Sequence, residues 1–344
     1  MKINEGIRAE EVRFCLLFDS EGVLLYQDLR DRLYGAKGIW SLMRFPKCGL
    51  VWLNPRLIPE DIGKPYTTYF THSVSNQTPK FSTLRRLIRN SILATQLGYT
   101  ELANVSLQKT LGMVLSWIGP IREMVELGVM FLNGQKRGKL LDVGCGSGAF
   151  LVKMKELGWD VVGVEPDRLA VKVAREHFGL SVYEGVLEEV GLPENEFDAI
   201  TMNHVIEHLY DPIATFKECR RVLKPGGRLV AITPNIESLG ARLFGEVWRG
   251  WEIPRHLYPF SPSTLQTLAE KAGLKVSHAR TAARSARWMY AASYLIRRNG
   301  TLPGGSPQEL GLRLRLGGLA FQVMEHGPCA FGDVGEELVM VATK

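Results

Sequence analysis

A strand followed by three closely spaced glycines constrains the fold more than any other stretch of this chain. Residues 138–150 read G-K-L-L-D-V-G-C-G-S-G-A-F, and the apolar run around Asp142 predicts a buried strand. An apolar helical pattern then begins at Phe150. A strand, a glycine turn and a helix in this order open a βαβ unit that binds a nucleotide-like cofactor. The three glycines, which let the backbone turn sharply and approach a ligand, are Gly144, Gly146 and Gly148.

The spacing of these glycines separates two kinds of cofactor. An NAD-dependent oxidoreductase needs G-x-G-x-x-G, with the pyrophosphate at the helix N-terminus. Here the third glycine comes one residue early, as G-x-G-x-G, and an acidic residue precedes the turn. This pattern resembles motif I of the class I methyltransferases that depend on S-adenosylmethionine (SAM). SAM has no phosphate but carries an ammonium, a carboxylate and a sulfonium, so an acid at the end of the strand suits it.

Three further matches follow in the order and spacing of that family. Glu165 lies at the end of the second strand, where an acid binds the ribose hydroxyls. Residues 197–212, F-D-A-I-T-M-N-H-V-I-E-H-L-Y-D-P, resemble motif IV and its flank. Residues 223–229, L-K-P-G-G-R-L, resemble the motif that follows it. The sequence is therefore similar to class I SAM-dependent methyltransferases over most of its length.

Regular alternation of strands and helices from residue 138 onward predicts an α/β fold. Each expected helix stops at a glycine, as a left-handed C-cap prefers. The last two strands have no helical crossover of the usual kind, so they predict an antiparallel edge. We expect a Rossmann-like, doubly wound, seven-stranded and mostly parallel sheet with an antiparallel last strand. This domain would span 138–344, with an acceptor or lid loop at 236–260 and an insertion at 283–332.

The resemblance implies a set of residues around the cofactor. Glu165 would bind the ribose, and Asp142 would lie near the ammonium or bond the amides of the turn itself. After the third strand the family usually has Gly-Asp, but here Gly185 is followed by Val186 and Leu187, so backbone groups and apolar walls would hold the adenine. The full expected set is Asp142, Gly144, Cys145, Gly146, Gly148, Glu165, Pro166, Val186, Leu187, Asn203 and His204.

Methyl transfer depends mostly on in-line positioning, and a general base matters when the acceptor is a hydroxyl. The expected catalytic candidates are His256, His208 and His204, with Arg255 for an anionic group of the acceptor. Each has a structural alternative: His208 would cap a helix, and Arg255 and His256 would pin the loop that carries them.

Residues 1–60 are rich in turns and resemble the zinc ribbon that precedes some bacterial methyltransferases, including sugar methyltransferases. Cys15 and Cys48 keep one cysteine of each pair, but Phe18 and Phe45 replace the other two. Two thiolates cannot close a structural site that needs four ligands, so we expect no metal and expect the two rings to pack together. The alternative is two unrelated buried cysteines.

Residues 61–137 predict a helical cap in which basic residues outnumber acidic ones. Such a stretch is either a solvated basic face or a contact with an anionic membrane surface. The basic residues are Lys80, Arg85, Arg86, Arg89, Lys109, Arg122, Lys136 and Arg137. The longest uncharged apolar run, 111–121, is too short to span a bilayer.

Composition is ordinary for a globular protein: 45% hydrophobic residues, a net charge of +6 and five scattered cysteines. The cysteines fit a reducing cytoplasm, and the N-terminus shows no signal peptide. We expect a cytoplasmic enzyme, peripheral at the inner membrane surface if the basic helices bind lipid, that uses SAM and binds no nucleic acid. Its acceptor would be a small molecule or a glycan or lipid-linked sugar. The alternatives are a quinone or secondary-metabolite O-methyltransferase and a non-catalytic SAM-binding scaffold.

Overall fold

The computed structural model describes residues 2–344 except 19, 67–82, 104, 308–309 and 328–332, so Lys80 and Cys329 lie outside the described residues. The chain divides into two compact units. The first unit comprises Met1–Phe70, His204–Phe216 and Ala231–Met340. The second comprises Thr71–Asn203, Lys217–Val230 and Val341–Lys344. This division differs from the predicted boundaries because residues 138–344 contribute to both units.

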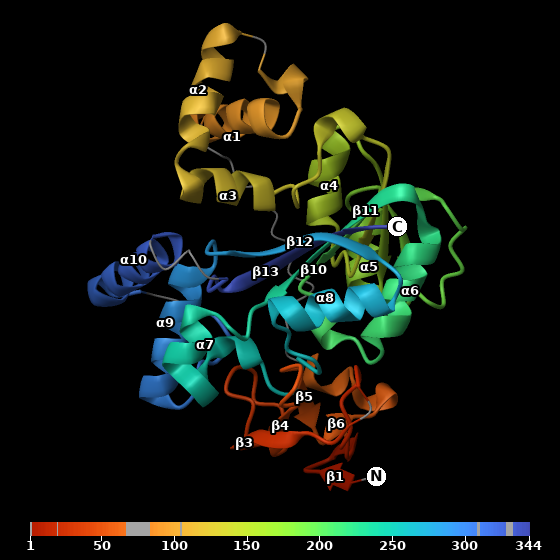
Figure 1. Ribbon diagram of the computed structural model, residues 1–344, viewed down its shortest axis with the longest axis vertical. Helices are drawn as coiled ribbons and strands as arrows, with labels where there is room; N and C mark the ends of the chain where they lie inside the picture. Colours follow the sequence, from red (N-terminus) through yellow and green to blue (C-terminus); the bar gives the residue numbers. More distant parts are fainter. Residues whose placement is uncertain (1, 19, 67–82, 104, 308–309, 328–332) are drawn as a thin grey trace. The chain divides into compact units, whose positions relative to one another are not determined.

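A seven-stranded sheet in the order β12-β13-β11-β10-β7-β8-β9 carries the expected fold (Figure 1). The pairs β10–β7, β7–β8 and β8–β9 are parallel, and one strand of the sheet is antiparallel, as predicted. The strands are β7 (Lys139–Val143), β8 (Asp160–Glu165), β9 (Ser181–Glu184), β10 (Phe197–Asn203), β11 (Leu223–Pro234), β12 (Lys275–Ala282) and β13 (Glu337–Thr343).

Helices alternate with these strands and end where the glycines predict. They are α4 (Ala149–Glu156), α5 (Arg168–Glu176), α6 (Pro212–Val222) and α8 (Pro262–Lys271). Gly158, Gly179 and Gly273 follow three of them with positive φ angles of 86°, 60° and 81°. Ser261 caps α8 by accepting a hydrogen bond from the amide of Thr264, whose hydroxyl accepts one from the Ser261 amide.

The region predicted to be a helical cap contains three helices in the second unit. These are α1 (Thr83–Gln96), α2 (Ser106–Ser116) and α3 (Gly119–Leu127), which pack on one another (Figure 1). Among the described residues, no helix is both long enough and apolar enough to cross a membrane.

The N-terminal region forms two three-stranded sheets in the first unit. One has the order β1-β2-β6 and the other β3-β4-β5. The strands are β1 (Lys2–Asn4), β2 (Ile7–Glu10), β3 (Val23–Leu29), β4 (Trp40–Arg44), β5 (Val51–Asn54) and β6 (Arg56–Leu57). The sulfurs of Cys15 and Cys48 lie 4.0 Å apart, and the rings of Phe18 and Phe45 pack with centroids 5.8 Å apart, as expected.

The insertion predicted at 283–332 contributes two helices to the first unit. They are α9 (Ala286–Asn299) and α10 (Leu312–His326), which lie side by side (Figure 1). The preceding loop region also contains the short helix α7 (Leu239–Phe244). The residues between α7 and α8 fold as short turns with Trp248, Trp251 and Tyr258 buried.

Candidate active site

The glycine turn after β7 has the backbone geometry that its sequence requires. Gly144, Gly146 and Gly148 adopt φ angles of 71°, 54° and 85°, which favour glycine. The amides of Gly144 and Cys145 donate to the carbonyl of Val164, at 2.8 and 3.2 Å. The turn is therefore tied to the neighbouring strand β8.

Glu165 braces this turn from the end of β8. Its Oε2 accepts a hydrogen bond from the amide of Gly146 at 2.8 Å, and its Oε1 accepts one from the amide of Asp167 at 2.9 Å. Asp167 in turn caps α5. A carboxylate oxygen has lone pairs for more than one donor, so these bonds leave the predicted ribose contact open.

Asp142 is buried in β7 and does not bond the turn, which was one of its two expected roles. It accepts a hydrogen bond from the hydroxyl of Thr201 at 2.6 Å, directly across the β7–β10 pair. Burial raises the pKa of Asp142, and the hydrogen bond from Thr201 lowers it. Burial is the larger effect, so the pKa is about 7. The role near the cofactor ammonium stays a prediction.

Gly163 is a functional position that the sequence reading missed. It lies inside β8, and a Cβ at this position would meet Sγ of Cys145 at 2.5 Å and Cδ1 of Leu151 at 2.9 Å. The glycine turn therefore packs on β8 only because this residue has no side chain. The available signal was a lone glycine in the apolar strand D-V-V-G-V-E, which marks a close backbone approach.

The remaining expected cofactor residues lie at strand ends of the second unit. Leu187 is buried and Val186 is more exposed, just after Gly185 beyond β9. Asn203 is the exposed last residue of β10. Their apolar or neutral character fits the expected walls of an adenine pocket, and their contacts with cofactor stay predictions.

His204 follows β10 with a strained left-handed φ of 55° and faces two buried carboxylates. Its Nδ1 lies 3.3 Å from Oε1 of Glu207, and its Nε2 lies 3.2 Å from Oε1 of Glu337. Burial alone would lower the pKa of His204, but the hydrogen bonds to both glutamates raise it to about 10. An imidazolium has no lone pair to accept a proton, so the geometry favours another residue as the base.

Arg255 has its guanidinium fully buried within the first unit. It donates to both carboxylate oxygens of Asp31, at 2.9 and 3.0 Å, and to the carbonyl of Pro65 at 3.1 Å. It also lies over the ring of Tyr34. This arrangement favours the alternative in which Arg255 pins its loop over the one in which it binds an acceptor anion.

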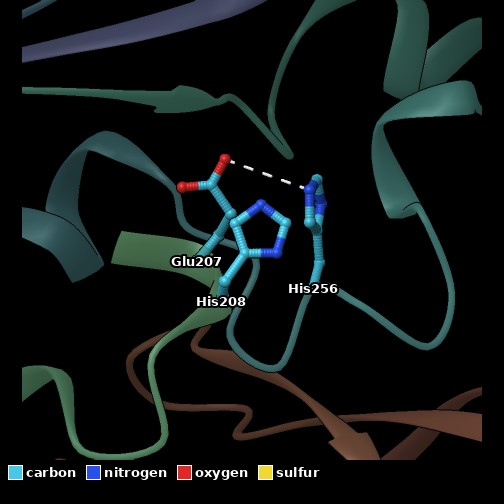
Figure 2. A group of neighbouring side chains, drawn as sticks. All are labelled: Glu207, His208 and His256. Atoms are coloured by element: carbon cyan, nitrogen blue, oxygen red, sulfur yellow. Dashed lines mark ion pairs between the residues drawn. The ribbon is translucent and has the colours of Figure 1, made fainter. Parts of the chain in front are cut away.

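Glu207, His208 and His256 converge in the first unit, and we name them the Glu-His cluster (Figure 2). Glu207 and His208 belong to the short helix after β10 (Ile206–His208), whereas His256 lies in the loop before α8. One ligand atom from each residue lies within 4.8 Å of the other two. Figure 2 shows the His208 ring between the Glu207 carboxylate and the His256 ring.

Hydrogen bonds fix how the two imidazoles present their nitrogens. Nδ1 of His256 lies 2.8 Å from the carbonyl of Gly250, and Nδ1 of His208 lies 3.1 Å from the carbonyl of Arg255. A carbonyl only accepts, so each Nδ1 carries the proton and each Nε2 keeps its lone pair in the neutral ring. Burial and the nearby His208 lower the pKa of His256 to about 4, so its ring is neutral.

The carboxylate of the cluster is ionised. Burial would raise the pKa of Glu207, but the ion pair with His204 and the nearby histidines lower it to about 2. The cluster thus combines one carboxylate with the neutral imidazole of His256 and the imidazole of His208. That combination suits either proton transfer or a divalent cation. Both histidines were named as candidates from the sequence. The sequence did not predict that they lie close together or that Glu207 lies beside them.

Comparison with known proteins identifies the same domain. Residues 121–279 match a family described as a methyltransferase domain. A ubiquinone biosynthesis O-methyltransferase from Cereibacter sphaeroides is 35% identical over 147 residues, which are 40% of this chain and 60% of that protein. One from Pseudomonas aeruginosa is 30% identical over 173 residues, 46% of this chain and 74% of that protein.

A solved SAM-dependent methyltransferase from Archaeoglobus fulgidus is 18% identical, with a TM-score of 0.43 over 66% of this chain and 94% of that one. The chain spans about 60% of the length of the Cereibacter protein. The chain covers 74% of the Pseudomonas protein. The assignment to a family rests on this relative and on the match to the methyltransferase domain. The chain belongs to the class I SAM-dependent methyltransferase family.

Proposed function

We propose that this chain transfers a methyl group from SAM to a hydroxyl of a small-molecule acceptor. The observation that carries the proposal is the glycine turn of β7 held by the carboxylate of Glu165. The turn offers close backbone approach, and the acid lies where the ribose hydroxyls of the cofactor bind in this family. The neutral imidazole of His256 is the group we propose as the base that a hydroxyl acceptor requires.

Two acceptor classes have support. The printed names of the relatives describe O-methyltransferases of ubiquinone biosynthesis, which favours a hydroxylated aromatic ring. The N-terminal resemblance to sugar methyltransferases favours a glycan precursor or a lipid-linked sugar. A methylation screen with labelled SAM would carry one arm of polyhydroxylated aromatics and one of nucleotide sugars and glycolipid precursors.

The proposal is tested by calorimetric titration with S-adenosylhomocysteine and, in parallel, with NAD. We expect binding of S-adenosylhomocysteine alone. Binding of neither compound would support a scaffold protein, and binding of NAD would contradict the assignment of the cofactor. Binding of S-adenosylhomocysteine with no methylation in either arm of the screen would contradict the acceptor classes while leaving the cofactor in place.

We also propose that the chain works at the cytoplasmic surface of a membrane. Helix α2 and the turn after it expose large apolar side chains, and Trp117 is 89% and Leu107 79% exposed. Lys109 lies on α2, and Arg122 lies on α3, the helix that follows the turn. Exposed tryptophan and leucine beside basic residues are typical of helices that lie in the interface of an anionic bilayer.

Flotation with liposomes tests this proposal. We expect the protein to float with phosphatidylglycerol liposomes more than with phosphatidylcholine liposomes, and Trp117→Ser to reduce flotation. Leu169→Ser is the matched control, because Leu169 is an exposed apolar residue on α5, outside the three helices. Equal flotation of wild type with both lipids, or of wild type and Trp117→Ser, would contradict the proposal.

A further inference from the structure

We propose that the Glu-His cluster binds one divalent transition-metal ion through Glu207, His208 and His256. This inference goes beyond the proposed methyl transfer, which needs no metal, and it concerns a place outside the N-terminal cysteines.

The first argument is the state of Glu207. Its side chain is completely buried. Among the described residues, neither of its oxygens accepts a hydrogen bond of good geometry, although Nδ1 of His204 forms an ion pair with Oε1 at 3.3 Å. Buried carboxylates are costly unless they are hydrogen-bonded, paired or bound to a metal. The ion pair with His204 involves Oε1, so a cation that also contacts Oε2 would give the second oxygen a partner that the described residues do not supply.

The second argument is the orientation of the two imidazoles. Both rings donate Nδ1–H to a backbone carbonyl, to Gly250 for His256 and to Arg255 for His208. Metal-binding histidines almost always donate their second nitrogen to such an acceptor, because this fixes the tautomer and the ring direction. The hydroxyl of Tyr66 lies 2.8 Å from Nδ1 of His208 and shares its proton as a second acceptor. Each Nε2 is thereby left as a ligand atom.

The third argument is distance. Ligand atoms that share one ion at about 2.0–2.2 Å are themselves roughly 3–4 Å apart. Nε2 of His256 lies 3.9 Å from Oε1 of Glu207, and each of the three residues places one nitrogen or oxygen within 4.8 Å of the other two. Small side-chain movements would close the remaining gap. Oε2 of Glu252 also lies 3.9 Å from Nε2 of His256, so a second carboxylate stands beside the same nitrogen.

The donor set selects the kind of ion. Two imidazole nitrogens and one carboxylate suit Zn²⁺, Mn²⁺ or Fe²⁺, whereas Mg²⁺ and Ca²⁺ prefer oxygen ligands. Three protein ligands also leave a coordination position open, as in catalytic rather than structural sites. If the proposed function holds, a bound ion would occupy the imidazole lone pairs, and it would then act as the Lewis acid that activates a hydroxyl of the acceptor in place of a free imidazole base.

The test uses the full chain, stripped of metal by a chelator and then titrated with Zn²⁺ in competition with a chromophoric chelator. We expect one equivalent to bind. Glu207→Gln and His256→Asn should each weaken binding at least as much as the roughly 10–100-fold loss known for outer-shell partners. Two controls should keep wild-type affinity: His278→Asn, an exposed histidine on β12, and the double variant Cys15→Ser with Cys48→Ser.

Substitution with Co²⁺ gives a second readout that does not depend on affinity. We expect d–d absorption bands of a nitrogen and oxygen site without a thiolate charge-transfer band. Loss of bound metal in the cysteine double variant, or unchanged affinity in both Glu207→Gln and His256→Asn, would overturn the proposal. Less than stoichiometric binding by wild type would also overturn it.

Binding of S-adenosylhomocysteine to each variant shows that it is folded. It also separates failure of this inference from failure of the proposed function, because the cofactor contacts expected from motif I lie elsewhere in the chain. Should His256→Asn fail to bind S-adenosylhomocysteine, His208→Gln replaces it in the comparison.

Discussion

Glu165 shows how a single carboxylate can serve both the fold and the ligand. Two backbone amides already hold its oxygens, one from the glycine turn and one from the start of α5. The sequence predicted its position from spacing alone, but it assigned the bonding of the turn to Asp142 as one alternative. Side-chain bonds of this kind depend on which strand pairs with which, and spacing along the chain does not reveal that.

Glu165→Ala should weaken binding of S-adenosylhomocysteine by about 1–3 kcal/mol, because a charged hydrogen-bond partner is lost and the glycine turn loses its brace. Calorimetric titration measures the change. Glu184→Ala is the matched control, since Glu184 pairs with Glu165 in register at the end of β9. Equal affinity of the Glu165 variant and wild type would remove the ribose assignment.

At the scale of elements, the strands and helices of the methyltransferase region could be predicted closely from the sequence. Glycine C-caps and the alternation of strands and helices predicted the order of these elements and where several helices end. The last strand of the predicted sheet is β13, Glu337–Thr343. What could not be predicted was how tightly elements pack, as at Gly163, because a single sequence does not show which backbone a side chain will meet.

Gly163→Ala tests that packing. The added Cβ would overlap Sγ of Cys145 and crowd Leu151, so we expect a loss of about 1–3 kcal/mol in the free energy of unfolding and weaker cofactor binding. Denaturant titration measures the first quantity. Gly119→Ala is the control, since nothing lies within 4 Å of a Cβ there.

Replacing Cys145 with alanine in the Gly163→Ala background should recover part of the loss, because the nearest clashing atom is then gone. A Gly163→Ala protein as stable as the Gly119→Ala protein would contradict the close approach of the turn to β8.

At the scale of the whole molecule, the first unit contains two buried carboxylates that pair with partly exposed cationic side chains, an arrangement that the sequence did not predict. His204 lies between Glu207 and Glu337, and Arg284 donates to Glu337 at 2.9 Å. These residues come from three separate segments of the chain, so no local pattern connects them. The Glu-His cluster could not be predicted for the same reason, because His256 comes from a different segment than Glu207 and His208.

This set of charges should give the stability of the protein a defined pH dependence. The pKa of His204 is about 10 in the folded protein against 6.5 for a free histidine, so its contribution is complete below about pH 6.5 and is lost as the pH rises toward 10. The pKa values of Glu207 and Glu337 are about 2, below the usual 4.5. Their contributions are therefore present above about pH 4.5 and lost as the pH falls toward 2.

Denaturant titrations of wild type and His204→Asn across pH 6–10 measure the alkaline part. The variant should be less stable near pH 6, and the difference should shrink as the pH rises. His278→Asn serves as the control for an exposed histidine. A difference that stays constant from pH 6 to pH 10 would show that His204 is neutral in the folded protein.

The first unit is built from segments that lie far apart in the sequence, and this affects how the protein can fold during synthesis. Its residues 1–70 belong with His204–Phe216 and Ala231–Met340, and this last segment includes the start of β13 at Glu337. Domains normally fold as they leave the ribosome, beginning from the N-terminus. In this chain residues 1–70 are made before the other segments of the first unit, because Thr71–Asn203 of the second unit lies between them. We therefore expect nascent chains released before residue 337 to need chaperones, and the order of synthesis to limit the yield of folded protein.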